Sequence, residues 1–409
     1  MPENREEAQR ERVLLLLKAV VFLDFLGVAF VLPLLQQYYT DASITGRLLG
    51  LLSSTFSVAQ FFAGIAVGIV ADYAPKRDIL LISFLGSLVS YAIIGSTTNI
   101  YLLFLSRVIV GLTKHTMTIT QVAITELTQF HPELRFKHTG HISALAQGSF
   151  LIGPSIGGLL YRYDKRLPIL CSVACFIANV SITYLFIPRE VCGKRNIKKE
   201  DAPPKESVYT HMLHLVENRS IQQLLMLRTT LFFIEMGLGS RSIANYYQNK
   251  FNIPTDRIAY MSSLSSGISL VIQLFLLGPL MRVLHNDEVF MIFLCLAGEV
   301  LVLLIEGLTN TFHYFLIFSY IPNILISSVF SNIVKSYSTN IVPAEDTGKC
   351  IAVFNTLSSI ASIAAPIYGA EVFLIFKEDA YKYKAYIAAS HYIIPLSLVL
   401  HMMYSKKLK

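Results

Sequence analysis

Charged side chains are scarce in this sequence of 409 residues. Only 15% of the residues are Asp, Glu, Lys or Arg, whereas 54% are hydrophobic and the mean hydropathy is +0.55. Soluble domains carry about 25% charged residues, so the composition excludes a soluble enzyme and indicates an integral membrane protein. The five cysteines show no zinc-like pairing and give no indication of a metal site.

Three further patterns are missing, and each excludes a class of protein. The polar stretch Met1 to Arg12 carries acids as well as bases, and the apolar run behind it lacks a small-residue cleavage site, so we read that run as a retained first span. No Gly-x4-Gly-Lys-Ser/Thr loop is present, so nothing indicates ATP-driven pumping, and no cofactor is expected. The net charge of +7 is spread over many short loops, which is typical of membrane topology rather than of nucleic-acid binding.

Twelve apolar windows are long enough to cross a bilayer. The first six lie near residues 13–37, 47–72, 79–97, 100–124, 139–161 and 167–188, and the second six near residues 221–247, 258–284, 289–308, 311–335, 347–373 and 384–404. The sequence therefore predicts an all-α membrane protein of twelve transmembrane helices in two six-helix bundles. The N-terminal bundle covers residues 1–188, a charged linker with Pro203-Pro204 covers 189–219, and the C-terminal bundle covers 220–409.

The two blocks show signs of topology and of duplication. On the twelve-span layout, Lys and Arg are more numerous in the tails, linker and loops on the side of the N-terminus than in the loops on the other side. The positive-inside rule therefore places both termini in the cytosol, and the membrane is either the plasma membrane or an endomembrane. Pro154-Ser-Ile-Gly157 and Pro366-Ile-Tyr-Gly369 are separated along the chain by almost the same interval as Asp24 and Glu235. Parallel halves with a site between them at mid-membrane are a known transporter architecture.

The segment Gly68-x3-Asp72-x2-Pro75-Lys76-Arg77 resembles the signature between spans 2 and 3 of the major facilitator superfamily. The resemblance implies a cytoplasmic gate in which Asp72 lies near a helix N-terminus and pairs with basic neighbours. The alternative is a charged turn that only keeps the helices from sliding. Tyr73 and Pro75 replace an Arg and a Gly of the family pattern, so we expect this gate to be stiffer and less fully paired.

Two more segments resemble motifs of the same family. Arg107-x3-Gly111 is similar to its second motif, and the run Val110 to Thr116 resembles the group called major facilitator superfamily domain-containing protein 9. The third motif, which is associated with proton-coupled antiporters, is similar to the segment Gly148-x4-Gly153-Pro154-x2-Gly157-Gly158. Its glycines allow another backbone to approach and its proline bends the helix, either for helix packing alone or for rocking of the bundles.

Ionisable residues inside the spans are the candidate substrate and proton-coupling residues, because an unpaired charge at mid-bilayer costs at least about 2.5 to 3.5 kcal/mol. These residues are Asp24, Arg107, Lys114, Arg228 and Glu235. Asp24 and Lys114 lie roughly 15 to 17 Å deep by helical rise, and Glu235 lies about 21 Å deep. In the family, spans 1, 4, 7 and 10 line the central cavity, so the resemblance places these charges on the transport path.

Spacing adds detail to this set. Arg107, Gly111 and Lys114 should share one face of a continuous helix, and Arg228 and Glu235 should share another. Our hypothesis is that Asp24 and Lys114 form an ion pair and that Asp24 or Glu235 exchanges a proton. The alternative is a fixed pair that only orders the helices.

Three further ionisable residues within the spans are expected to be structural. His115 points away from Lys114 and should pack against a neighbouring helix. Glu299 and Glu306 lie in span 9, which in the family is outside the cavity ring, and they should either form hydrogen bonds with neighbouring helices or approach the outer surface.

The sequence thus predicts a secondary transporter, not an enzyme, that moves a small polar or charged organic solute by alternating access with a leaning toward proton antiport. A monomer in the lipid bilayer with the solute and protons as partners, and without nucleic acid, is expected. The alternative is a receptor or interaction scaffold of the same fold that moves no solute, which the altered Tyr73 and Pro75 leave open.

Overall fold

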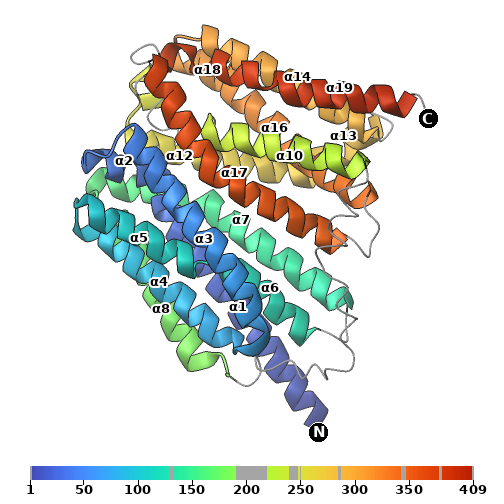
Figure 1. Cartoon of the computed structure of the whole chain (residues 1–409). Helices are drawn as coiled ribbons and strands as arrows, with labels where there is room; N and C mark the ends of the chain where they lie inside the picture. The colour runs from blue at the N-terminus through green and yellow to red at the C-terminus, as the bar shows by residue number, and fades with distance from the viewer. Residues whose placement is uncertain are drawn as a thin grey trace. The chain divides into compact units, whose positions relative to one another are not determined.

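The computed structural model describes the backbone of residues 2–128, 132–189, 219–238, 247–248, 250–283, 287–341, 347–376 and 380–407 (Figure 1). This part of the chain is helical and contains no strand, which confirms the predicted all-α fold. Within it, eleven helical stretches are long and apolar enough to cross a membrane. Helix α10 (Arg219–Gly237), which covers most of the seventh predicted span, is not among these eleven and contains Arg228 and Glu235. Residues 190–218 of the expected linker lie outside the described residues.

The helices follow the order of the predicted spans. The first block consists of α1 (Pro2–Val31), η1 (Leu32–Leu34), α2 (Leu35–Asp41), α3 (Arg47–Tyr73), α4 (Lys76–Ser96), α5 (Ile100–Thr113), α6 (Thr116–Leu127), α7 (Pro132–Tyr163) and α8 (Leu167–Phe186). The second consists of α10, α12 (Thr255–Val271), η3 (Ile272–Leu276), α13 (Leu277–Val283), α14 (Glu288–Leu308), α15 (Phe312–Phe315), η4 (Leu316–Tyr320), α16 (Ile321–Ile341), α17 (Thr347–Phe376), α18 (Ala380–His391) and α19 (Ile393–Lys407).

Local sequence explains where several helices begin and end. Pro75 has no backbone N–H, and α3 ends at Tyr73 before α4 begins at Lys76. Asn99 precedes α5, and its side-chain oxygen accepts a hydrogen bond from the Tyr101 N–H at 2.9 Å. Such a cap satisfies one of the free N–H groups at a helix start.

Contacts along the chain divide it into two compact units. Unit 1 comprises Met1–Thr45, Thr55–Asp201 and Pro254–Ser266, and unit 2 comprises Gly46–Ser54, Ala202–Ile253 and Gly267–Lys409. In unit 1, α1 packs on α7 and α8, and α4 packs on α5, α6 and α8. In unit 2, α10 packs on α17 and α19, and α14 packs on α16, α18 and α19. Figure 1 shows these helices side by side within each unit.

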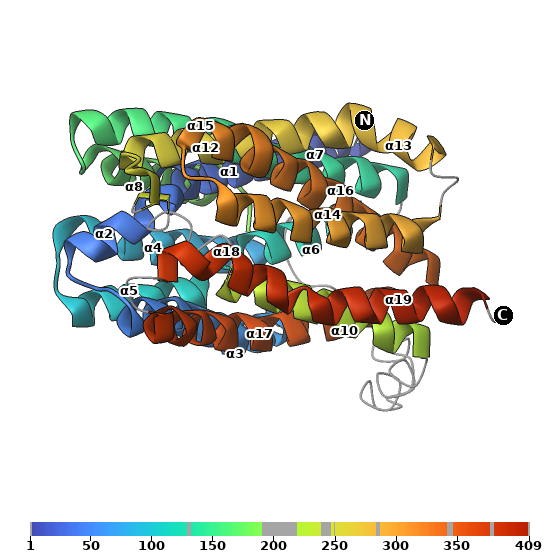
Figure 2. The same ribbon diagram turned by 90° about the horizontal axis from the view of Figure 1, so that it is seen from above.

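The first turns of α3 belong to unit 2, where they lie beside α17 in both views (Figure 1, Figure 2). Arg47 Nε donates to Glu371 Oε1 at 2.6 Å, and its Nη2 donates to the other carboxylate oxygen at 2.8 Å. Deeper along the helix, Ser54 Oγ donates to the backbone oxygen of Ile363 at 2.7 Å. A paired fork of this kind gives geometric specificity to the contact between the first turns of α3 and α17 inside unit 2.

Many large apolar side chains on both units are exposed. Leu15 is 65% exposed, Phe62 63%, Phe275 71% and Leu301 59%. Contiguous apolar surface of this extent is unfavourable in water, whereas helices that satisfy their own backbone hydrogen bonds can present it to lipid. The surface therefore agrees with a multi-pass integral membrane protein.

Glycines on α7 set the distance to α1 within unit 1. A Cβ added to Gly153 would lie 2.5 Å from Ala29 Cβ, and one added to Gly157 would collide with the backbone of Phe30. In the same way, a Cβ on Gly369 of α17 would collide with the backbone of Gly237 on α10 in unit 2. Both halves thus use a glycine after an in-helix proline for a close helix contact.

The remaining members of the third motif differ in their surroundings. A Cβ on Gly158 would lie 2.8 Å from Ala259 Cβ, a residue of α12 that belongs to the same unit. Pro154 is buried inside α7. No atom lies within 4 Å of the position of a Cβ on Gly148, so this glycine is not required for packing among the described residues.

The motif offers a matched pair of substitutions. We expect Gly157→Ala to destabilise the protein by about 1 to 3 kcal/mol, because the added methyl group must displace the backbone of α1. We expect Gly148→Ala to be neutral or to stabilise the protein by up to about 1 kcal/mol through helix propensity. Thermal melting of both variants in detergent measures the difference, and equal melting temperatures would contradict the packing role of Gly157.

Candidate functional site

Asp24 and Lys114 form a buried ion pair inside unit 1. The Asp24 side chain on α1 is completely buried, and Lys114 Nζ donates to its Oδ1 atom, with 17% of the lysine side chain exposed. The hypothesised pairing is therefore present. The second carboxylate oxygen, Oδ2, is buried and has no hydrogen-bond partner in the described part of the chain. This oxygen is therefore an unused hydrogen-bond acceptor inside unit 1.

Span 4 is interrupted at Lys114, which differs from the expected continuous helix. Helix α5 ends at Thr113, and Lys114 has φ −77° and ψ 82°, outside the helical region. The next N–H, that of His115, donates to Thr113 O at 2.9 Å and to Ser83 Oγ at 3.3 Å instead of continuing the helix. Lys114 thus does not share a face of one helix with Arg107 and Gly111. At the break, Lys114 pairs with Asp24 and the His115 N–H donates to Ser83.

Aromatic and amide side chains of α8 surround the pair. Lys114 Nζ lies 5.3 Å from the centre of the Phe176 ring, a cation–π distance. The Phe176 ring is in turn 5.3 Å from that of Tyr91. One turn further along α8, Asn179 is completely buried, and neither side-chain amide atom has a partner among the described residues. Asn179 is not among the predicted site residues, because a lone Asn in an apolar helix gives little signal.

Arg107 is also buried in unit 1, but it does not join the ion pair. Its side chain lies over the ring of Tyr39 at 5.7 Å, and the residue is 8% exposed. The Nε and Nη2 atoms of the guanidinium have no hydrogen-bond partner within the described residues. A buried guanidinium with free N–H groups is suited to bind an anionic or carbonyl group.

Lys76 and Arg77 of the first motif contact residues that lie outside the motif. Lys76 is completely buried, and its Nζ lies 2.7 Å from Glu126 Oε1 on α6. Arg77 Nη2 donates to the backbone oxygen of Tyr184 at 2.8 Å. The side chains of Gly68 and Asp72 lie outside the described residues, so the pairing expected for Asp72 stays a prediction.

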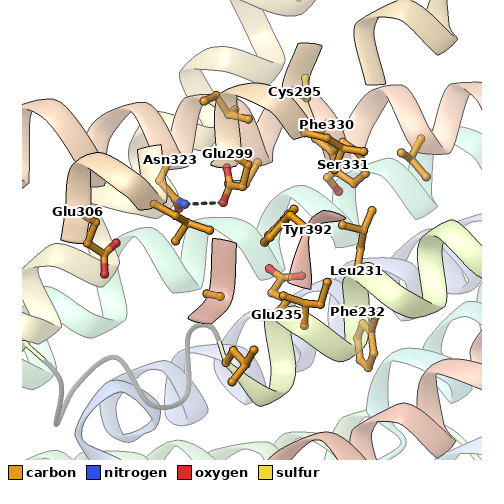
Figure 3. A pocket seen from close by; sticks show the side chains of 18 of the residues that line it. Leu231, Phe232, Glu235, Cys295, Glu299, Glu306, Asn323, Phe330, Ser331 and Tyr392 are labelled. Carbon is orange, nitrogen blue, oxygen red and sulfur yellow. Dashed lines mark hydrogen bonds between the residues drawn. The ribbon is translucent and has the colours of Figure 1, made fainter. Parts of the chain in front are cut away.

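Unit 2 encloses a cavity of about 430 Å³ (Figure 3). It is lined by residues of α10, α14, η4, α16 and α18. Phe354 of α17, Tyr247 and Tyr392 complete the wall. Glu235 and Arg228 of α10 both line it, which fits their predicted common helix face. The Arg228 guanidinium lies 3.5 Å from the centre of the Phe354 ring.

Two carboxylates of α14 line the same cavity, although the sequence indicated a position outside the cavity ring. Asn323 Nδ2 donates to Glu299 Oε1 at 2.5 Å, which agrees with the expected hydrogen bond to a neighbouring helix. Glu306 accepts from Ser319 Oγ at 3.3 Å. Glu299 and Glu306 are seven residues apart and so share one face of α14, and the structure turns this face toward the cavity, whereas the family resemblance had placed span 9 outside the cavity ring. Within the described residues, no group of three or more His, Cys, Asp or Glu is arranged to hold a metal ion.

Lys250 approaches Glu306 from outside the spans. Its Nζ donates to the backbone oxygen of Glu306 at 2.6 Å. Burial lowers the pKa of the Lys250 ammonium, and the nearby Glu306 carboxylate raises it in part. The Glu306 carboxylate thus has the Lys250 ammonium nearby.

Comparison with known proteins identifies a family of transporters. Residues 17–366 match the family model described as Major Facilitator Superfamily. Multidrug resistance protein 2 of Bacillus subtilis (strain 168) is 24% identical over 293 residues, which cover 70% of this chain and 71% of that protein. Quinolone resistance protein NorA of Staphylococcus aureus is 33% identical over 150 residues, and this match spans 36% of the chain and 38% of NorA.

Solved structures show the same fold at low sequence identity. The human organic anion transporter MFSD10 (TETRAN) has a TM-score of 0.65 and 17% identity, with 95% of this chain and 99% of that chain covered. The nucleoside transporter NupG has a TM-score of 0.76 and 14% identity, with 96% and 99% covered. At these identities the likeness concerns the fold alone.

The Asp24–Lys114 pair can be tested through stability. We expect Lys114→Met to cost about 3 to 5 kcal/mol, because it leaves the Asp24 carboxylate buried without its cation. Adding Asp24→Asn should recover most of that loss, since both charges are then gone. Thermal melting of the two variants in detergent measures the coupling.

A matched lysine provides the control for this cycle. Lys165 pairs with Asp41 at 2.6 Å, but its side chain is 60% exposed, so Lys165→Met should cost at most about 1 kcal/mol. A double variant no more stable than Lys114→Met would contradict the charge argument.

Proposed function

Because the chain belongs to the Major Facilitator Superfamily, as the match over residues 17–366 shows, we propose that it is a secondary transporter of a small polar or charged organic solute. The transport would proceed by alternating access and would be coupled to protons, with antiport favoured. Within the superfamily we assign it to the domain-containing protein 9 group on the run Val110 to Thr116.

The buried Asp24–Lys114 pair is the observation that carries this proposal. Burying two charges is unfavourable unless they are well paired, and a well-packed apolar pair of similar volume is often at least as stable. A pair that leaves Asp24 Oδ2 without a partner is therefore poorly explained by stability alone. A carboxylate that must bind and release a proton or a solute group needs this kind of free oxygen.

Two features support an organic substrate and coupling of its transport to protons. The relatives in Bacillus subtilis and Staphylococcus aureus are named for multidrug and quinolone resistance, and these names refer to organic compounds. Asp24 in unit 1 and Glu235 at the cavity of unit 2 are carboxylates within spans. Protonation would remove the charge of either one, which for Asp24 is a completely buried charge, and a neighbouring cation would oppose that protonation.

The first motif is proposed to be the inner gate, with both termini in the cytosol. The completely buried Lys76 and its partner Glu126 tie the start of α4 to α6, and this contact fixes the segment that carries Asp72. An exposed pair, Arg189 Nη2 with Asp78 Oδ2 at 2.7 Å, lies beside it. The buried pair is the one expected to affect transport.

Proton-coupled transport is tested in proteoliposomes with a pH dye inside. We expect members of a panel of organic cations, anions and zwitterions to drive proton flux through the wild-type protein. Glu235→Gln should abolish the proton flux but leave solute counterflow, if Glu235 is the coupling carboxylate. If Asp24 is that residue, Asp24→Asn combined with Lys114→Met should give this result instead.

Each outcome of this assay has a defined meaning. Unchanged uptake and unchanged proton dependence in both sets of variants would refute the coupling role of these carboxylates. A solute that raises the melting temperature but shows no counterflow in wild-type vesicles would favour the receptor or scaffold function.

The gate is tested by a pair of neutralising substitutions. Glu126→Gln should lower the transport rate severalfold while membrane expression stays normal, because it leaves the buried Lys76 charge without a partner. Asp78→Asn removes the exposed pair and should leave transport within about twofold of wild type. Equal rates for the two variants would argue that the segment is only a turn between helices.

A further inference from the structure

The cavity of unit 2 contains two carboxylates that form no ion pair with a cation of the described part of the chain. Glu235 faces the cavity from α10, and Glu299 faces it from α14 (Figure 3). Among the described residues, no Lys, Arg or His nitrogen lies within ion-pair distance of either one. The two carboxylates are close enough to feel each other's charge. Two like charges in an apolar bundle repel each other and also lose hydration.

Glu299 is held in a fixed orientation with one oxygen left over. Asn323 donates to Oε1 at 2.5 Å, and Figure 3 shows this contact at the cavity. The other oxygen, Oε2, is buried and has no hydrogen-bond partner within the described part of the chain. A buried acceptor without a donor costs about 1 to 3 kcal/mol or more, so the site favours a ligand that brings positive charge or a donor.

The other charged side chains that line the cavity, Glu306, Arg228 and Lys384, have interactions of their own. Glu306 has Lys384 and Lys250 within electrostatic range. Arg228 lies over the face of Phe354. In Figure 3, Glu306 lies apart from the region between Glu235 and Glu299, where Tyr392 is found. The region between Glu235 and Glu299 is therefore the part of the cavity where negative charge is not balanced by a described cation.

The walls suit an organic cation better than a small inorganic one. Six aromatic side chains line the cavity, namely Phe232, Tyr247, Tyr320, Phe330, Phe354 and Tyr392. Aromatic faces attract a desolvated ammonium group and also bind an apolar body. A volume of about 430 Å³ is in the range of small-molecule pockets, whereas a bare metal ion needs several converging oxygen ligands.

We propose that the cavity of unit 2 binds a monovalent organic cation, an ammonium group on an aromatic or apolar body, with Glu299 as the main counter-charge and Glu235 as the second. Asn323 is a positioning residue that holds the Glu299 carboxylate. As an assignment of the solute class, this proposal rests on the proposed transport function. As a binding site, it is testable without transport.

The test uses two probes of the same shape that differ in charge. The probes are 3-hydroxyphenyltrimethylammonium and 3-tert-butylphenol, with benzenesulfonate as the anionic comparator. Calorimetry on the purified full chain in nanodiscs at neutral pH should show that the ammonium compound binds at least tenfold more tightly than the phenol. Benzenesulfonate should not compete.

Substitutions test whether the Glu299 carboxylate is the counter-charge of the ammonium probe. Glu299→Gln should weaken binding of the ammonium probe at least tenfold while the melting temperature stays close to wild type, since a Gln oxygen can still accept from Asn323. Asn323→Ala should weaken it less, because the carboxylate remains. Glu288→Gln is the control, as it changes a carboxylate at the start of the same helix, away from the residues that line the cavity.

Three results would overturn the proposal. These are equal affinity for the ammonium and phenol probes, unchanged binding in Glu299→Gln, and displacement of the ammonium probe by an equal concentration of sodium. Counterflow in proteoliposomes from the same preparation separates this proposal from the general one. Binding without counterflow refutes transport and leaves the site, whereas counterflow of anionic solutes only, without binding of the ammonium probe, refutes the site and leaves transport.

Discussion

Every charge buried in these helices must be balanced, because the bilayer offers no water to solvate it. In unit 1 the buried Asp24 and Lys76 are paired internally, with Lys114 and Glu126, whereas the buried Arg107 lies over the ring of Tyr39. The cost of this arrangement is a break in the fourth span, where Lys114 leaves the helix. A broken helix is tolerated at membrane depth only where other groups satisfy the freed backbone, and Ser83 does so by accepting from the His115 N–H.

Close helix contacts provide the frame that keeps these charges in place. In lipid the association of helices depends on van der Waals packing and hydrogen bonds rather than on the exclusion of water. Gly157 on α7 and Gly369 on α17 allow the backbones of α1 and α10 to approach. Since Asp24 and Glu235 lie on those same two helices, the glycine contacts also set the positions of the candidate coupling carboxylates.

The sequence predicted what depends on composition, spacing and depth. The spans follow from hydropathy, and Asp24 and Lys114 could be paired because both lie about halfway along their spans. The interruption at Lys114 was not predictable, because it depends on Ser83 from another span. The inward position of Glu299 was missed because the family resemblance placed span 9 outside the cavity ring, although Glu299 and Glu306 share one face of α14. The partner of Lys76 is Glu126, which lies about fifty residues further along the chain and outside any motif.

The difference between the two units bears on coupling. The Asp24 charge in unit 1 is matched by Lys114 of the same chain, whereas Glu235 and Glu299 in unit 2 have no cationic partner among the described residues. In the proposed site, a proton or a cation that enters the cavity compensates them. If an organic cation and a proton compete for the same carboxylates, each excludes the other, and a protein that changes access only when these charges are compensated exchanges one for the other. Antiport then follows from a local lack of positive charge, without a separate coupling device.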